Sequence, residues 1–99
     1  MFGLYPGSYE EIQKILAEFD SIEEVIIYGS RAKGTHREGS DIDLVLLGDI
    51  SEHDLNLLWH KLDDSFIPYK FDISVYSKLN SESLVDHIKR IGKIFYKKK

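Results

Sequence analysis

The chain has 99 residues, of which 42% are hydrophobic, 30% are charged and only two are prolines, a composition typical of one folded domain over residues 1–99 and not of a disordered segment. Seventeen acidic and thirteen basic residues give a formal charge of −4, which argues against nucleic acid as a direct substrate because phosphate neutralisation supplies most non-specific affinity. The lack of cysteine excludes disulfides and thiolate metal sites, and no apolar run approaches the ~20 residues of a membrane span, so we expect a cytoplasmic protein that does not enter membranes.

The first half of the chain predicts a helix followed by two strands. Ser8 and Glu11 have the spacing of a capping box, and apolar residues then recur at helical intervals, so we expect a helix over about 9–20. The β-branched and aromatic run 24–28 predicts a short buried strand that ends at Gly29. Three segments follow in order: a helical turn at 30–33, a polar loop at 34–39 and a strand at 41–47.

The second half predicts two amphipathic helices and the remaining strands. Ser51 can begin a helix over about 52–64, whose apolar stripe should cover one face of the sheet. Asn80 or Ser81 can cap a last helix, and Gly92 suits its end. The remaining strands are expected at 70–76 and, as a short edge strand, at 94–96.

This order of elements predicts an α/β (α+β) fold. We expect a small mixed or antiparallel sheet of three to four strands, with helices mainly on one face. The loop between the first two strands is shorter than the crossover that a parallel pair needs, so these two strands should be antiparallel.

The segment 29–44, GSRAKGTHREGSDIDL, contains the residues with the clearest chemistry. Gly29 permits a tight turn that a side chain would obstruct, and Ser30 can offer a hydroxyl and an amide to a phosphate oxygen. Asp41 and Asp43 point the same way if the segment is extended, because alternate residues of a strand share a face. Two such carboxylates can hold hard divalent cations against a polyphosphate, so the sequence predicts nucleotide chemistry.

Asp72 lies on the polar face of the predicted third strand and would complete a set of three carboxylates beside the second strand. Three close anions repel one another unless a cation joins them, and two Mg²⁺ ions, or Mn²⁺ in their place, could bridge them to a triphosphate. Asp41, Asp43 and Asp72 are therefore the expected metal ligands and catalytic residues, with Asp72 able to receive a hydroxyl proton. The cationic side chains that could contact phosphate oxygens are Arg31, Lys33 and Arg37.

The Gly29-Ser30 pair, the ten residues after it and the Asp41-x-Asp43 pattern resemble the signature of the DNA polymerase β-type nucleotidyltransferase superfamily. Within it, the chain is similar to the minimal nucleotidyltransferases of HEPN/MNT toxin–antitoxin pairs, and the resemblance covers nearly the whole chain. It implies a polymerase β-like fold in which Gly29 and Ser30 hold the β- and γ-phosphates. It also implies that Asp41 and Asp43 bind both metals and that Asp72 is the third carboxylate.

The function implied by the resemblance is metal-dependent transfer of AMP from ATP, or from another nucleoside triphosphate, to a tyrosine hydroxyl of a small helical HEPN-type partner. The chain would act as the antitoxin of that partner. Two alternatives stay open: transfer to a small hydroxylated molecule such as an antibiotic, by a homodimer or other homo-oligomer, and neutralisation of a partner by binding without catalysis.

Several residues also have simpler interpretations. Asp41 and Asp43 could be solvated or capping carboxylates, and Asp72 could be a surface charge on an edge strand. Trp59 has the spacing of a core residue, whereas Tyr76 could border the nucleotide. The four histidines, which show no metal-ligand spacing and are expected on the surface or in packing, are His36, His53, His60 and His87.

Overall fold

The computed structural model describes residues 2–37 and 39–99, which form four strands, four α-helices and one 3₁₀ helix. The strands lie in the order β3-β2-β1-β4. β1 pairs antiparallel with β2 and with β4, whereas β2 pairs parallel with β3, so the predicted mixed sheet and its antiparallel first pair are confirmed. The elements are α1 (Pro6–Ala17), β1 (Ile22–Tyr28), α2 (Ser30–Lys33), β2 (Ile42–Gly48), α3 (Glu52–Asp64), β3 (Phe71–Val75), η1 (Tyr76–Lys78), α4 (Glu82–Ile91) and β4 (Lys93–Lys97).

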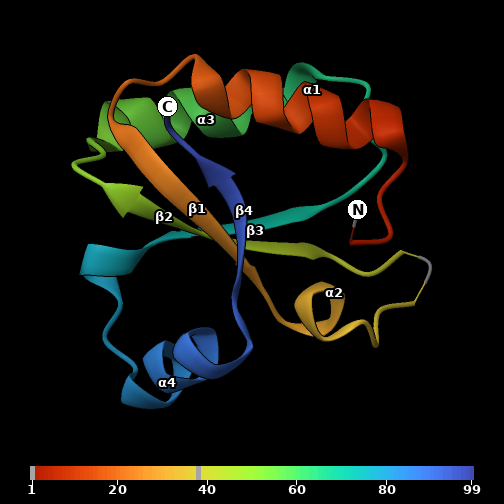
Figure 1. Ribbon diagram of the computed structural model, residues 1–99. Coiled ribbons are helices and arrows are strands. Elements are labelled where there is room, and N and C mark those ends of the chain that lie inside the picture. Colours follow the sequence, from red (N-terminus) through yellow and green to blue (C-terminus); the bar gives the residue numbers. More distant parts are fainter. Residues whose placement is uncertain (1, 38) are drawn as a thin grey trace.

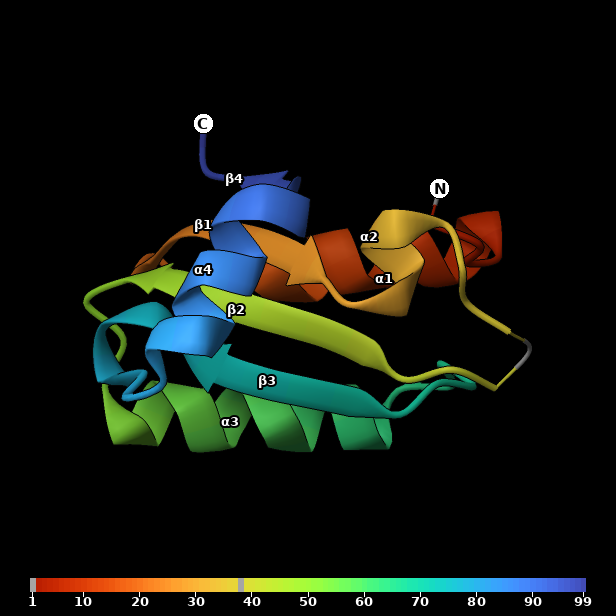
Figure 2. The same cartoon turned by 90° about the horizontal axis from the view of Figure 1, so that it is seen from below.

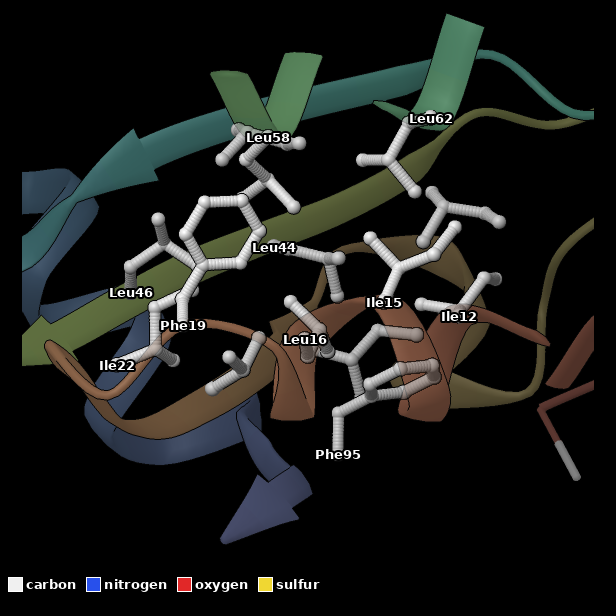
Figure 3. Packing of buried hydrophobic residues seen from close by; sticks show 14 of the residues in the cluster. Ile12, Ile15, Leu16, Phe19, Ile22, Leu44, Leu46, Leu58, Leu62 and Phe95 are labelled. Atoms are coloured by element: carbon white, nitrogen blue, oxygen red, sulfur yellow. The ribbon is translucent and has the colours of Figure 1, made fainter. Parts of the chain in front are cut away.

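The main hydrophobic core lies between the sheet and its two longest helices. Figure 1 shows α1 and α3 together above the sheet. The two longest helices therefore lie on one face, as predicted. Leu16 of α1 and Leu58 of α3 are fully buried there against Ile27 and Leu44 of the central strands. Figure 3 shows how these side chains interdigitate, and the half-buried Trp59 packs against the same cluster, as predicted.

The opposite face of the sheet carries a smaller core beneath α4. Side chains alternate between the two faces of a strand, so Tyr28 and Val45 turn away from the main core and pack with Ile88 of α4. Figure 2, which views the molecule from below, shows α4 lying across this face. Gly92 ends α4 in ordinary extended geometry, with φ −60°, and its lack of a side chain serves close packing, because a Cβ there would lie 2.6 Å from the Cγ2 of Ile26.

The start of α1 differs from the prediction. Ser8 does not cap this helix, which begins at Pro6 with Tyr5 in the N-cap position and no side-chain cap, and which ends at Ala17. Proline at the first helical position has a suitable φ and no amide hydrogen to satisfy, so the helix starts before the capping-box pattern.

Later boundaries follow the predicted caps more closely. The hydroxyl of Ser51 accepts a hydrogen bond from the backbone N of Asp54 at 3.1 Å, and the hydroxyl of Ser81 accepts one from Leu84 N at 3.2 Å. β3 ends one residue before the predicted 70–76 strand does, because Tyr76 begins η1. No helix in the described part of the chain has the length and apolar character needed to cross a membrane.

Two neighbouring leucines of α3 test the importance of the main core. Leu58 is fully buried, whereas Leu57 is 40% exposed. We expect Leu58→Ala to lower the free energy of unfolding by about 2–5 kcal/mol, because it removes apolar contacts and leaves a cavity. Leu57→Ala should change it by only about 0.5 kcal/mol. Urea unfolding of both variants checks this, and equal losses would contradict the assignment of the core.

Candidate active site

Three strands bring the predicted carboxylates together at one end of the sheet, where β1 ends and where β2 and β3 begin. β1 runs opposite to β2 and β3, so the end of β1 lies beside the start of β2, and the start of β3 lies on the other side of β2. The register pairs Tyr28 with Asp43 and Asp43 with Asp72, and directly paired residues project to the same face. Asp41 lies just before β2. The sheet therefore gathers Asp41, Asp43 and Asp72, as the sequence predicts, on the face that carries α4.

Gly29 lies directly after β1 at this end of the sheet, in a backbone conformation that requires glycine. Its φ of 75° and ψ of −155° fall in a region that other residues essentially do not occupy. A Cβ built on Gly29 would collide with the Oδ2 atom of Asp43. Ser30 then begins α2, and the backbone N of Lys33 donates to the carbonyl of Gly29 at 3.1 Å. The expected tight turn is present, and the contact of Gly29 and Ser30 with phosphate stays a prediction.

Burial and neighbouring charges shift the pKa values of two groups at this end of the strands. Burial raises the pKa of Asp43, and the neighbouring charges of Asp72 and then Asp41 raise it further, while His87 opposes the shift. The pKa of Tyr28 is also raised, first by burial and then by Asp72 and Asp43. Asp43 is thus a half-buried carboxylate under repulsion from two others, an arrangement that a cation would relieve.

The donor set suits a divalent cation, because carboxylate oxygens are the hard ligands that Mg²⁺ and Mn²⁺ prefer. Asp43 and Asp72 are direct neighbours across β2 and β3. Within residues 2–37 and 39–99, however, no three acidic or histidine side chains already converge closely enough to form a metal-binding group. The residues fit such an ion by charge and donor type, and their assignment as ligands stays a prediction.

Two residues near the carboxylates were not recognised from the sequence as part of this site. Tyr28 is the last residue of β1 and directly precedes Gly29. This position in the sequence could have indicated that Tyr28 belongs to the site. His87 lies on α4 with its ring edge-on to Tyr28 at a centroid distance of 6.2 Å. Its closeness depends on how α4 folds back over the sheet, which no local spacing indicates. His53 and His60 are exposed on α3, as expected.

The other predicted site residues are one buried arginine and two exposed cations. Arg31 is only 3% exposed, and its guanidinium donates to the carbonyl groups of Phe2 and Ser40. Its contact with phosphate stays a prediction, as do those of the exposed Lys33 and Arg37. Tyr76 packs against the core beneath α4. His36 is half-buried, and its Nδ1 atom has no hydrogen-bond partner among the residues that the structure describes.

Two glycine substitutions compare the Gly29 turn with an ordinary left-handed position. Gly34 has φ 78° and ψ 12°, and a Cβ on it would meet nothing within 4 Å among the described residues. We expect Gly34→Ala to cost roughly 1–2 kcal/mol of the free energy of unfolding, from left-handed geometry alone. Gly29→Ala should cost about 1 kcal/mol more, since its backbone region is closed to other residues and a Cβ there must also displace Asp43. Urea unfolding measures both, and equal costs would contradict the assignment of Gly29 as the constrained position.

The raised pKa of Asp43 predicts how stability depends on pH. The folded chain binds this proton more tightly than the unfolded chain does, so the free energy of unfolding falls as pH rises through the pKa of the unfolded state toward that of the folded state. Asp43→Asn should therefore be more stable than the wild type at pH 7, and the gain should vanish below the ordinary pKa of a carboxyl group. Asp63→Asn, on the exposed surface of α3, is the matched control. A loss of stability in Asp43→Asn at pH 7 would contradict the raised pKa of Asp43.

Comparison with known proteins places this site in a family. The family model described as "Polymerase beta, Nucleotidyltransferase" matches residues 10–99. No curated protein matches the chain. Three similar solved structures are a toxin–antitoxin crystal structure with AMP-PNP (TM-score 0.72, 21% identity, 92% of this chain and 74% of that one), a tri-AMPylated Shewanella oneidensis HEPN toxin in complex with MNT antitoxin (0.65, 18%, 92% and 71%) and the MntA–HepT toxin–antitoxin (0.60, 17%, 95% and 74%).

These structural likenesses show the polymerase β-like fold that the sequence predicts. The match to the family model shows the family as well as the fold. It covers most of the chain, including the Gly29 turn and all three carboxylates. The chain belongs to the polymerase β nucleotidyltransferase family.

Proposed function

We propose that this protein transfers AMP from ATP to a tyrosine hydroxyl of a HEPN-type partner, and that it thereby acts as the antitoxin of that partner. The observation that carries the proposal is the register of Asp43 beside Asp72, with Asp43 pressed against the Gly29 turn. The family supports nucleotidyl transfer. One structural neighbour contains AMP-PNP and another contains an AMPylated HEPN toxin, which supports the donor and the acceptor class.

The turn after β1 is the proposed binding site for the phosphates of ATP, the nucleotide donor. A side chain at residue 29 would collide with the carboxylate of Asp43, so glycine lets this carboxylate lie directly against the turn to which the polyphosphate is proposed to bind. Ser30, at the start of α2, offers its hydroxyl and its amide to phosphate oxygens. On this proposal the β- and γ-phosphates lie over Gly29 and Ser30, with the α-phosphate directed toward the carboxylates.

The charge of the site makes a cation necessary for this binding. Two unit charges about 4 Å apart interact by about 4 kcal/mol at an effective dielectric constant of about 20. An ATP polyanion would meet several such repulsions from Asp41, Asp43 and Asp72. These residues would hold Mg²⁺, two ions on this proposal, or Mn²⁺. When bound, the ions polarise the α-phosphorus and neutralise the charge that develops on the leaving group.

The transfer itself exchanges one bond to phosphorus for another. The acceptor oxygen forms a bond to the α-phosphorus, and the bond from that phosphorus to the oxygen that bridges it to the β-phosphorus breaks, which releases pyrophosphate. Asp72 is exposed beside the half-buried Asp43, so it is the carboxylate best placed to meet an incoming hydroxyl and to take its proton. A cytoplasmic location for this reaction stays a prediction.

Transfer of label from ATP tests the proposal. The wild type is incubated with Mg²⁺, the product of the adjacent gene as the candidate partner, and ATP labelled on either the α- or the γ-phosphate. We expect the partner to gain the α-label alone, and replacement of its acceptor tyrosine by phenylalanine to abolish labelling. Asp43→Asn should lower the rate by at least about 10²-fold, because it removes a charge that stabilises the transition state.

Asp63→Asn is the matched control, since it removes one exposed carboxylate from α3 on the other face of the sheet. It should label the partner at the wild-type rate. Equal labelling by wild type and Asp43→Asn would contradict the proposed chemistry. Neutralisation of the partner by Asp43→Asn, without labelling, would show that binding alone is the mechanism.

A further inference from the structure

Arg31 is the one charged side chain that is buried among the residues the structure describes, with 3% of its surface exposed. Burial of an ionised group is costly unless its donors are paired. The cost is met by contacts outside its own helix: Nε and Nη2 donate to the carbonyl oxygen of Ser40 at 3.3 and 2.9 Å, and Nη1 donates to the carbonyl oxygen of Phe2 at 3.0 Å. The guanidinium also stacks over the ring of Tyr69, 4.9 Å from its centroid. One side chain thus joins four segments of the chain.

The positions of these partners relate the contacts to the active site. Arg31 directly follows Ser30 of the turn, and Ser40 directly precedes Asp41. The Arg31–Ser40 bonds therefore connect the two halves of the nucleotide motif across the loop between them. The Tyr69 segment reinforces the connection, because the backbone N of Ile42 donates to the carbonyl of Lys70 at 2.8 Å.

We propose that Arg31 is a positioning residue, which holds Asp41 and the start of β2 at a fixed place relative to the Gly29-Ser30 turn and does not bind phosphate. The proposal rests on the nucleotidyl transfer proposed above. A planar fork of donors is needed to reach two carbonyl groups in different directions while stacking on a ring, which lysine cannot do. The guanidinium is already committed to these partners, so phosphate contact would require it to leave them.

Limited trypsin digestion tests the positioning role without any need for activity. Arg37 is exposed in the loop that Arg31 ties down, whereas Lys61 lies in α3 and reports unfolding of the whole chain. We expect Arg31→Met and Arg31→Lys both to speed cleavage after Arg37 by about tenfold or more without faster cleavage at Lys61, because cleavage tracks local opening. Arg90→Met, which removes an exposed arginine from α4, should leave both rates unchanged.

Nucleotide binding and turnover distinguish positioning from phosphate contact. With Mg²⁺ present and the partner absent, both Arg31 variants should bind a non-hydrolysable ATP analogue within about twofold of the wild type, because the guanidinium that they replace is committed to Phe2 and Ser40. With Mg²⁺ and the partner, kcat should fall about 10²-fold at little-changed KM for ATP, as expected when catalytic groups are misplaced.

A different pattern would overturn the proposal: affinity for the ATP analogue in Mg²⁺ that falls about tenfold in Arg31→Met and returns in Arg31→Lys, with cleavage after Arg37 unchanged. That result would make Arg31 a phosphate ligand. If Arg31→Met does not fold, Arg31→Lys and Tyr69→Leu decide, because loss of the stacked ring should also speed cleavage after Arg37. Absence of transfer by the wild type would contradict the proposed function, while digestion and ATP affinity would still decide the role of Arg31.

Discussion

The carboxylate of Asp43 lies against the backbone of Gly29 with no room for a side chain between them. This contact exists because β1 runs antiparallel to β2 and ends directly beside Asp43, and because the parallel β3 sets Asp72 next to it. The sheet is held in this arrangement by the core that α1 and α3 form on its far face. The turn, the carboxylates and the cation that they are proposed to bind therefore all depend on one packed sheet.

The same arrangement makes the site unfavourable in the absence of a ligand. Asp43 is half-buried, and its pKa is raised by burial and by Asp72 and Asp41, so its ionised form lowers the stability of the fold at neutral pH. A site of this kind is tolerated because stability comes from elsewhere, chiefly from the fully buried side chains of the main core. The repulsion that weakens the fold is also what favours a divalent cation together with a polyphosphate.

Local sequence patterns were sufficient where one segment determines its own structure. The strand before Gly29, the caps at Ser51 and Ser81 and the antiparallel first pair were all predictable, because each depends on a few neighbouring residues. The Ser8 cap was wrong because Pro6 offered an earlier start for α1. The surroundings of Arg31 and the approach of His87 to Tyr28 depend on segments far apart in the chain. No spacing within the 29–44 motif contains that information.

Metal binding in the presence of a nucleotide tests the central claim most directly. Mn²⁺ is titrated into the wild type, Asp43→Asn and Asp63→Asn, each with a non-hydrolysable ATP analogue, and bound ions are counted by electron paramagnetic resonance. The account predicts two bound Mn²⁺ ions per chain for the wild type and for Asp63→Asn, as expected of a two-metal site, with loss of binding in Asp43→Asn. Equal Mn²⁺ binding by all three proteins, or none by the wild type, would contradict it.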